Sequence, residues 1–165
     1  MSELPSRVRR AFRDHGSFEA VDDATWISTT TAFDGEVAAD TDEDGVTHFD
    51  VTVTVPTLKA ATADEVADVV ANGWFETFEL RVSDIGGVAR GDHEFDPAVT
   101  RNGEAIVSEF SLSDINERRG VDDAGAVIDF VEGTYVQGII PGYDYVDPVD
   151  SLLSKARQQG NDGAV

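Results

Sequence analysis

The segment from Val46 to Leu58, VTHFDVTVTVPTL, alternates between apolar and polar residues. Phe49, Val51, Val53 and Val55 fall on one side of an extended chain, because successive side chains of a strand point to opposite faces. One face of such a strand must be covered by other parts of the chain, while the other can meet water. The segment therefore predicts an antiparallel sheet with helices over a single face.

Two hairpins supply the rest of that sheet. The first joins TWISTTTAFDGEVAAD, which is rich in β-branched residues, to the alternating segment through the loop TDEDG. The second joins HEFDPAVT to EAIVSEFSL through Arg101-Asn102-Gly103, because Asn-Gly favours a tight hairpin turn. A short extended piece is expected around Phe18–Val21.

Helices are predicted where apolar residues recur with a 3.6-residue period. The first spans residues 4–15 and ends at Gly16, and the last is short and starts at Asp147-Pro148. Thr62 and Glu65 have the spacing of a capping box that opens another helix. A further helix is capped by Asp122 and ends at Pro141. Its glycines, Gly133 and Gly138, are predicted to permit close approach of a neighbouring element.

The predicted order of elements is α-ββ-α-ββ-α-α. Two hairpins with one apolar face each merge into an antiparallel sheet covered by helices, which defines an α+β fold. Since no repeat or linker interrupts the chain, we expect one domain over residues 1–160 and a disordered tail over 161–165.

Charge is the most unusual property of the composition. The chain has 33 acidic and 12 basic residues, a net charge of −21, and Lys59 and Lys155 are its lysines. Acidic residues are spread over every segment, which disfavours both an acidic tail and a nucleic-acid mimic. Repulsion on such a surface is screened over about 10 Å at 0.1 M salt and about 3 Å at 1 M. We therefore expect a protein adapted to molar salt, with an unspecific shell of K⁺, Na⁺ and water.

The sequence also limits location and cofactors. It contains no cysteine, so disulfides and thiol chemistry are excluded. It has no apolar run of the length of a signal peptide or a membrane span. We expect a cytoplasmic protein that binds no membrane and needs no cofactor.

The segment DTDEDG matches the opening of a calcium-binding loop and makes Asp40, Asp42 and Asp44 weak metal-ligand candidates. The twelfth position of that loop should be a bidentate glutamate, but it is Val51, and a strand follows where a helix is required. We therefore expect an ordinary hairpin turn and no specific metal site.

No residues form a recognisable catalytic motif. His15, His48 and His93 have neither metal-ligand spacing nor a nucleophile context, so no catalytic residue is assigned. The four arginines of the first helix could in principle contact phosphates, but the strongly negative whole molecule opposes a nucleic-acid partner. An arginine face paired with carboxylates of this chain, or of a second copy, is the favoured interpretation.

The segment FVEGTYVQGIIPGYDYVDPV, residues 130–149, is the most aromatic part of the chain. Tyrosine combines apolar area with a hydrogen-bonding hydroxyl and is common at interfaces. Tyr135, Tyr143, Tyr145 and Trp74 are therefore the candidates for contact with a ligand or partner, although packing within the fold is the main alternative for the Tyr143–Tyr145 pair.

Three segments carry a family resemblance: FDVTVTVPTL, ANGWFETFELR at 71–81, and RGVDDAGAVIDFVEGTYVQGIIPGYDYVDPV at 119–149. Together they resemble an uncharacterised family of small acidic proteins from halophilic archaea. This resemblance implies habitat and a common fold but transfers no catalytic residue. The inferred order of elements is also similar to type III secretion chaperone-like sandwiches, which bind other proteins and often dimerise.

These observations leave the biochemical activity unknown. The leading hypothesis is a non-catalytic, salt-adapted, cytoplasmic binding or adaptor protein whose partner is another protein or a second copy of itself. The alternative is a small enzyme or ligand-binding protein with a pocket near the tyrosine-rich segment 135–145.

Overall fold

The computed structural model describes residues 4–89, 91 and 93–163, with side chains described as far as residue 158. Its centre is a six-stranded antiparallel sheet with the strand order β1-β2-β3-β4-β6-β5. The strands are β1 (Phe18–Asp22), β2 (Thr25–Ser28), β3 (Asp34–Thr41), β4 (Thr47–Pro56), β5 (Ala98–Asn102) and β6 (Ala105–Asp114). The expected α+β class is confirmed, although the predicted first strand is divided into β2 and β3, and Phe18–Asp22 adds a further strand.

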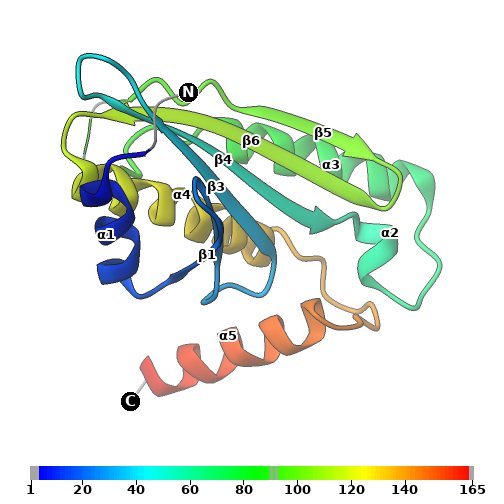
Figure 1. The fold of residues 1–165 in the computed structure, drawn as a ribbon. Coiled ribbons are helices and arrows are strands. Elements are labelled where there is room, and N and C mark those ends of the chain that lie inside the picture. Colours follow the sequence, from blue (N-terminus) through cyan, green and yellow to red (C-terminus); the bar gives the residue numbers. More distant parts are fainter. Residues whose placement is uncertain (1–3, 90, 92, 164–165) are drawn as a thin grey trace.

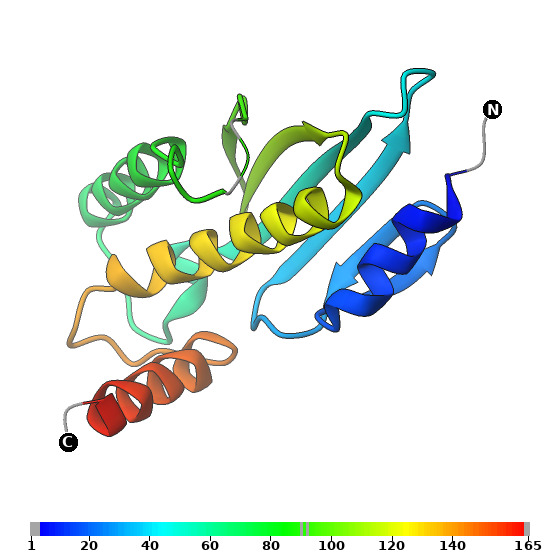
Figure 2. The ribbon, with the colours of Figure 1, turned by 90° about the vertical axis from the view of Figure 1, so that its left-hand side faces the viewer.

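Helices cover one face of this sheet (Figure 2). Here α1 (Ser6–His15), α3 (Asp68–Ser83) and α4 (Glu117–Gln137) lie side by side, with α4 in the middle. The short α2 (Leu58–Ala61) follows β4, and α5 (Val149–Gly163) lies beyond α4 on the side away from the sheet (Figure 1). The expected tail at 161–165 stays a prediction, because residues 164–165 lie outside the described chain.

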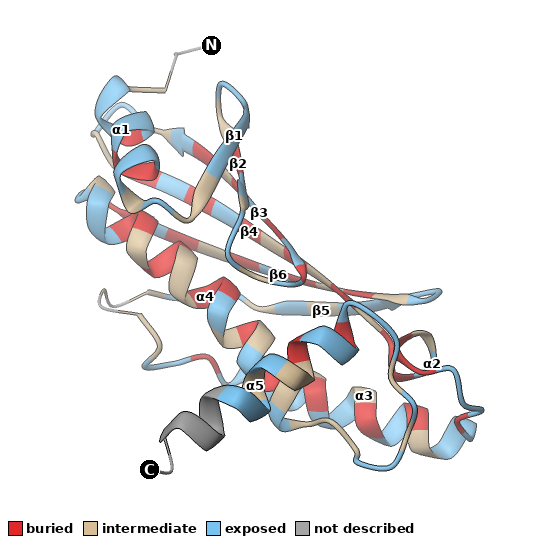
Figure 3. Ribbon diagram, turned by 90° about the horizontal axis from the view of Figure 1, so that it is seen from below, coloured by how far each residue is buried: buried red, intermediate tan, exposed pale blue. Residues whose placement is uncertain are grey.

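The alternating segment forms β4, and its apolar residues face the helices as predicted. Phe49, Val51 and Val53 are fully buried, and Val55 is 2% exposed. Val51 lies opposite Val37 on one neighbouring strand and opposite Phe110 on the other. Buried residues, red in Figure 3, accordingly lie where the helices meet the sheet.

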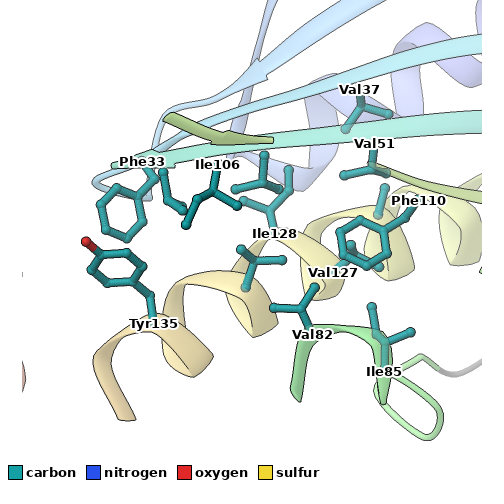
Figure 4. Close-up of a cluster of buried hydrophobic side chains, with 14 of the residues drawn as sticks. Phe33, Val37, Val51, Val82, Ile85, Ile106, Phe110, Val127, Ile128 and Tyr135 are labelled. Carbon is teal, nitrogen blue, oxygen red and sulfur yellow. The ribbon is translucent and has the colours of Figure 1, made fainter. Parts of the chain in front are cut away.

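The core continues from the sheet into α4. Val127, Ile128, Val131 and Tyr135 follow the helical period and are all buried, which confirms the period predicted from the sequence. Figure 4 shows Ile128 between the helix and the sheet, and Tyr135 beside Phe33 at the end of the cluster. The alternation of β4 and the period of α4 therefore form the two sides of one core.

Two predicted helix starts are wrong. The capping-box residue Thr62 does not open a helix, because its hydroxyl donates to the Asp144 carbonyl, and α3 begins only at Asp68. Asp122 does not cap α4, which begins at Glu117 with the Asn116 side chain accepting from the Arg119 N–H. In the first case a long-range contact replaces the local capping interaction, and in the second a better cap lies upstream.

The apolar residues of α3 divide between its buried and its exposed side. Trp74, Phe78 and Val82 are buried, whereas Val69 is 78% exposed. The glycine prediction for α4 also fails at Gly133, where an added Cβ would meet nothing within 4 Å. The close approach occurs instead at Gly120, where a Cβ would stand 2.4 Å from Cε2 of Phe49.

Candidate functional site

The tyrosine-rich segment is divided between core and surface. Tyr135 is fully buried, its hydroxyl donates to the Pro56 carbonyl at 3.0 Å, and its ring meets Trp74 edge-on at 5.2 Å. Burial raises the pKa of the Tyr135 hydroxyl far above its ordinary value. Trp74 donates its indole N–H to the Gly138 carbonyl at 3.0 Å. These two candidates therefore support the end of α4 from within.

Tyr143 and Tyr145 are half-buried and pack against the edge of the core, in the loop between α4 and α5. The loop is fixed against residues 61–64, because Ala63 donates its N–H to the Asp144 carbonyl and Val146 donates to the Ala61 carbonyl. The two rings meet edge-on at 6.3 Å, and Tyr145 donates its hydroxyl to the Ile140 carbonyl at 2.5 Å. Partial burial raises the pKa of the Tyr145 hydroxyl.

Both tyrosines border a cleft of about 470 Å³ between this loop and α5. Its apolar wall includes Val136, Ile139 and Leu153, and Arg157 is a basic residue at its border. The volume falls in the range of small-molecule sites, and mixed apolar and polar walls are typical of them. We call this place the tyrosine cleft.

The DTDEDG segment forms the β3–β4 hairpin loop, and Asp42 organises it. Its Oδ1 accepts the N–H groups of Asp44 and Val46, and its Oδ2 lies 2.9 Å from Nε2 of His48. The hydrogen bond from His48, with those from the backbone, lowers the pKa of the Asp42 carboxyl. Asp42 therefore organises the hairpin turn that was expected between these two strands.

Sequence analysis missed a buried cluster of charged residues at the other end of α4. Nε2 of His93 lies 2.8 Å from Oδ2 of Asp123, and these side chains are 4% and 2% exposed. Asp114, whose side chain is 3% exposed, receives two hydrogen bonds from Arg119, at 2.6 and 2.8 Å. The guanidinium holds the pKa of the Asp114 carboxyl below its ordinary value, and the carboxylate raises the pKa of Arg119.

Three separate elements assemble this cluster, which we call the His93 cluster: His93, Asp114, Asp123 and Arg119. His93 lies in the connection between α3 and β5, Asp114 ends β6, and the other two belong to α4. The sequence did contain a signal. Asp114 continues the alternation of the buried Phe110 and Leu112, so the strand pattern predicts that its side chain points into the core. Asp123 lies four residues before the buried Val127 and therefore on the same side of the helix.

A third feature lies where the arginine helix meets the first strand. Arg9 and Arg13 of α1 border a groove of about 570 Å³, together with Phe18, Ala20 and Asp22 of β1. Phe12 stacks on the Trp26 ring beneath it, with centroids 3.9 Å apart. Among the arginines of α1, Arg7 lies 3.8 Å from Glu117. No ion pair of Arg9 or Arg13 is found within the described chain.

The fold and these sites define the class of protein. It is an α+β protein whose antiparallel sheet is covered by helices on one face, with a buried histidine–carboxylate cluster between the sheet and α4. Residues 13–155 match a family model described as "Family of unknown function (DUF5813)". The chain belongs to this family. No curated protein and no solved structure gives a significant match. Within the described residues, no helix combines the length and the apolar character needed to cross a membrane.

Proposed function

We propose that this protein is a non-catalytic binding protein of a salt-adapted cytoplasm, and that it acts as a homodimer joined through the β1 edges of two copies. The observation that supports it most directly is the open outer edge of β1 beside the groove that holds Arg9 and Arg13. An unpaired strand edge is a template for addition of another strand.

The backbone N–H and C=O groups of β1 alternate in direction as such pairing requires. Thr29 donates its N–H to the Ser17 carbonyl, so the backbone groups of Ser17 and Glu19 turn toward β2. Backbone groups alternate along an antiparallel strand, and those of Phe18 and Ala20 therefore turn to the open edge. Two copies of β1 paired antiparallel about Ala20 would exchange hydrogen bonds at that residue and extend the sheet across both molecules.

The charges and apolar surface of the edge are self-complementary in this arrangement. Pairing about Ala20 sets Phe18 of one copy opposite Asp22 of the other, and Arg13 borders the same groove as Phe18. Each Arg13 then lies near an Asp22 of the second copy, and the two-fold axis makes this contact twice. The same pairing covers Val21, which is 54% exposed in one copy.

The dimer is expected to depend on salt. Each copy has a net charge of −21, so two copies repel each other. This repulsion is strong at 0.1 M salt, where the screening length is about 10 Å, and much weaker at 1 M salt, where it is about 3 Å. We expect mass close to twice 17.7 kDa in 2 M KCl and dissociation at 0.1 M KCl. Unfolding followed by circular dichroism over the same KCl series tests the salt adaptation separately, since fold stability should rise with KCl.

Light scattering on a sizing column in 2 M KCl tests the interface. Arg13→Glu should weaken dimerisation at least about tenfold, because it places like charges together across the interface. Adding Asp22→Arg to that variant should restore it. Arg10→Glu is the matched control, since Arg10 lies on the same exposed helix but does not border the groove.

A backbone variant separates strand addition from charge. Ala20→Pro removes the N–H that the second copy needs, while an edge strand tolerates proline whose N–H side faces water. Ala98→Pro, at the start of the opposite edge strand β5, is its control. A protein that is monomeric at every KCl concentration, or a dimer that survives both Ala20→Pro and Arg13→Glu, would overturn the proposed interface.

The tyrosine cleft supports a second candidate function, the binding of a small apolar ligand that carries an anionic group. The supporting observation is the cleft itself, which lies at the segment 135–145 where a pocket was expected, with Arg157 at its border.

Anilinonaphthalene sulfonate is a suitable probe of the tyrosine cleft because it is aromatic and anionic. Its fluorescence in 2 M KCl should saturate, and Tyr143→Ser and Arg157→Gln should each weaken binding. Leu80→Ser is the control, because Leu80 is 73% exposed on α3 and does not border the cleft. Unsaturable fluorescence in the wild type would dismiss this candidate.

A further inference from the structure

The His93 cluster brings together the donor atoms of a metal site. One ring nitrogen of His93 and one oxygen from each of Asp114 and Asp123 all lie within 4.8 Å of one another, and their side chains are at least 96% buried. We propose that these three residues bind one Zn²⁺ ion. The proposal is independent of the dimer interface, which lies at the β1 edge.

The ligand types and their spacing suit this ion. Zn²⁺ takes imidazole nitrogen at about 2.0–2.1 Å and carboxylate oxygen at about 2.0–2.2 Å, commonly with tetrahedral geometry. Ligand atoms on such a tetrahedron are about 3.4 Å apart. His93 and Asp123 start from 2.8 Å, and every other pair lies within 4.8 Å, so shifts of about 1 Å bring the three atoms onto one ion.

The charge of the cluster also favours a cation. Two buried carboxylates, those of Asp114 and Asp123, contribute oxygen atoms to the cluster, and a divalent cation can balance their charges. The Arg119 side chain is 46% exposed and can move toward water. Zn²⁺ would then lie between the carboxylates of Asp114 and Asp123 and the ring nitrogen of His93.

Backbone groups orient the two carboxylates. Asn116 donates its N–H to Oδ1 of Asp114 at 2.8 Å, and Gly91 donates its N–H to Oδ2 of Asp123 at 3.0 Å. Such contacts orient ligands and raise metal affinity. A Cβ at Gly91 would stand 2.5 Å from Nε2 of His93, so the chain wraps the imidazole at a distance that only glycine permits. The backbone thus orients both carboxylates, and an ion would require only the shifts of about 1 Å and the movement of Arg119.

The alternative is that the cluster is purely structural and binds no metal. In that case the hydrogen bond between His93 and Asp123 only fastens the connection between α3 and β5 to α4. A measurement of metal binding distinguishes the two interpretations, because a purely structural cluster has no affinity for an added ion.

The experiment is a calorimetric titration of chelator-treated protein with Zn²⁺ in 2 M KCl. A second titration with Co²⁺, monitored by absorption, uses that ion as a coloured probe of the same site. Molar KCl suppresses weak binding by the many surface carboxylates. We expect one saturable equivalent of Zn²⁺, absorption bands of low-symmetry Co²⁺, and a melting temperature that rises with Zn²⁺ concentration. His93→Gln and Asp123→Asn should each weaken Zn²⁺ binding by about 100-fold or more, as loss of a ligand exceeds the 10–100-fold cost of losing an outer contact.

The matched control is His48→Gln. His48 and Asp42 also form a histidine–aspartate pair, at 2.9 Å, but their side chains are 52% and 39% exposed. This variant should keep the saturable equivalent. Wild-type protein that shows no saturable equivalent overturns the proposal whatever the variants do, and so does binding that is lost in His48→Gln but kept in His93→Gln.

Discussion

Replacing Gly120 by alanine tests whether α4 sits as close to β4 as the structure places it. The added Cβ would stand 2.4 Å from Cε2, 2.8 Å from Cζ and 3.3 Å from Cδ2 of Phe49, whereas ordinary contacts are 3.4–4 Å. The helix or the ring must therefore move by about 1 Å. Phe49 is fully buried, and its ring also meets that of Phe12 at 6.0 Å, so it has little room to retreat.

The magnitude follows from two opposing contributions. Overpacking of a core costs about 1–3 kcal/mol. Removing a glycine from a helix gains about 0.5–1 kcal/mol. Gly120→Ala should therefore lower the free energy of unfolding by about 1–2 kcal/mol, and for a chain of 165 residues this corresponds to a melting temperature lower by about 2–8 °C.

Gly133→Ala is a control on the same helix. Gly133 is exposed, and a Cβ there would meet nothing within 4 Å, so only the gain of about 0.5–1 kcal/mol applies. Urea unfolding in 2 M KCl, followed by circular dichroism, should separate the variants by about 2 kcal/mol. If the two substitutions stabilise the protein equally, α4 does not contact Phe49 at Gly120, and the packing argument is refuted.

Three further predictions concern polar groups that are buried or half-buried. Ser108→Ala should stabilise the fold by about 1 kcal/mol in urea unfolding, because the Ser108 hydroxyl is fully buried and has no hydrogen-bond partner within the described chain; a loss of stability would mean that the hydroxyl is satisfied. Tyr135→Phe should cost about 1–3 kcal/mol in the same assay by leaving the Pro56 carbonyl without its donor, and an unchanged midpoint would contradict this. Burial raises the pKa of Glu132, so its charged form weakens the fold above the unfolded pKa of about 4.3, and stability returns as pH falls through the raised native value. Glu132→Gln should therefore stabilise the fold at neutral pH, by an amount that shrinks in thermal melts at lower pH; a gain independent of pH would exclude this cause.

Some parts of this structure were determined by local pattern. Strict alternation in β4 leaves one way to bury Phe49, Val51 and Val53 together, because a slip of one residue would expose all of them. The helical period of α4 works similarly for Val127, Ile128 and Val131. Both patterns repeat at short range, so the α+β class and the single covered face followed from the sequence.

Local pattern was a poorer guide where a distant contact competes with it. Thr62 has capping-box spacing, yet its hydroxyl is taken by the Asp144 carbonyl more than 80 residues away. That competing contact cannot be recognised from the residues nearby.

The candidate sites divide in the same way. A pocket was expected near residues 135–145, and a cleft does lie there, but only the fold separates Tyr135, which completes the core, from Tyr143 and Tyr145, which face the cleft. The hairpin turn at DTDEDG was expected because a strand pattern follows it.

Sequence alone determined the elements with repeated short-range patterns, the acidic surface and the one-sided sheet. Tertiary structure alone decided which glycine of α4 meets a ring and which histidine meets two aspartates. The physical reason is that His93, Asp114 and Asp123 come from a connection, a strand end and a helix, and no spacing along the chain encodes their distance. They become neighbours only when β6 and α4 pack, and that packing depends on the whole core.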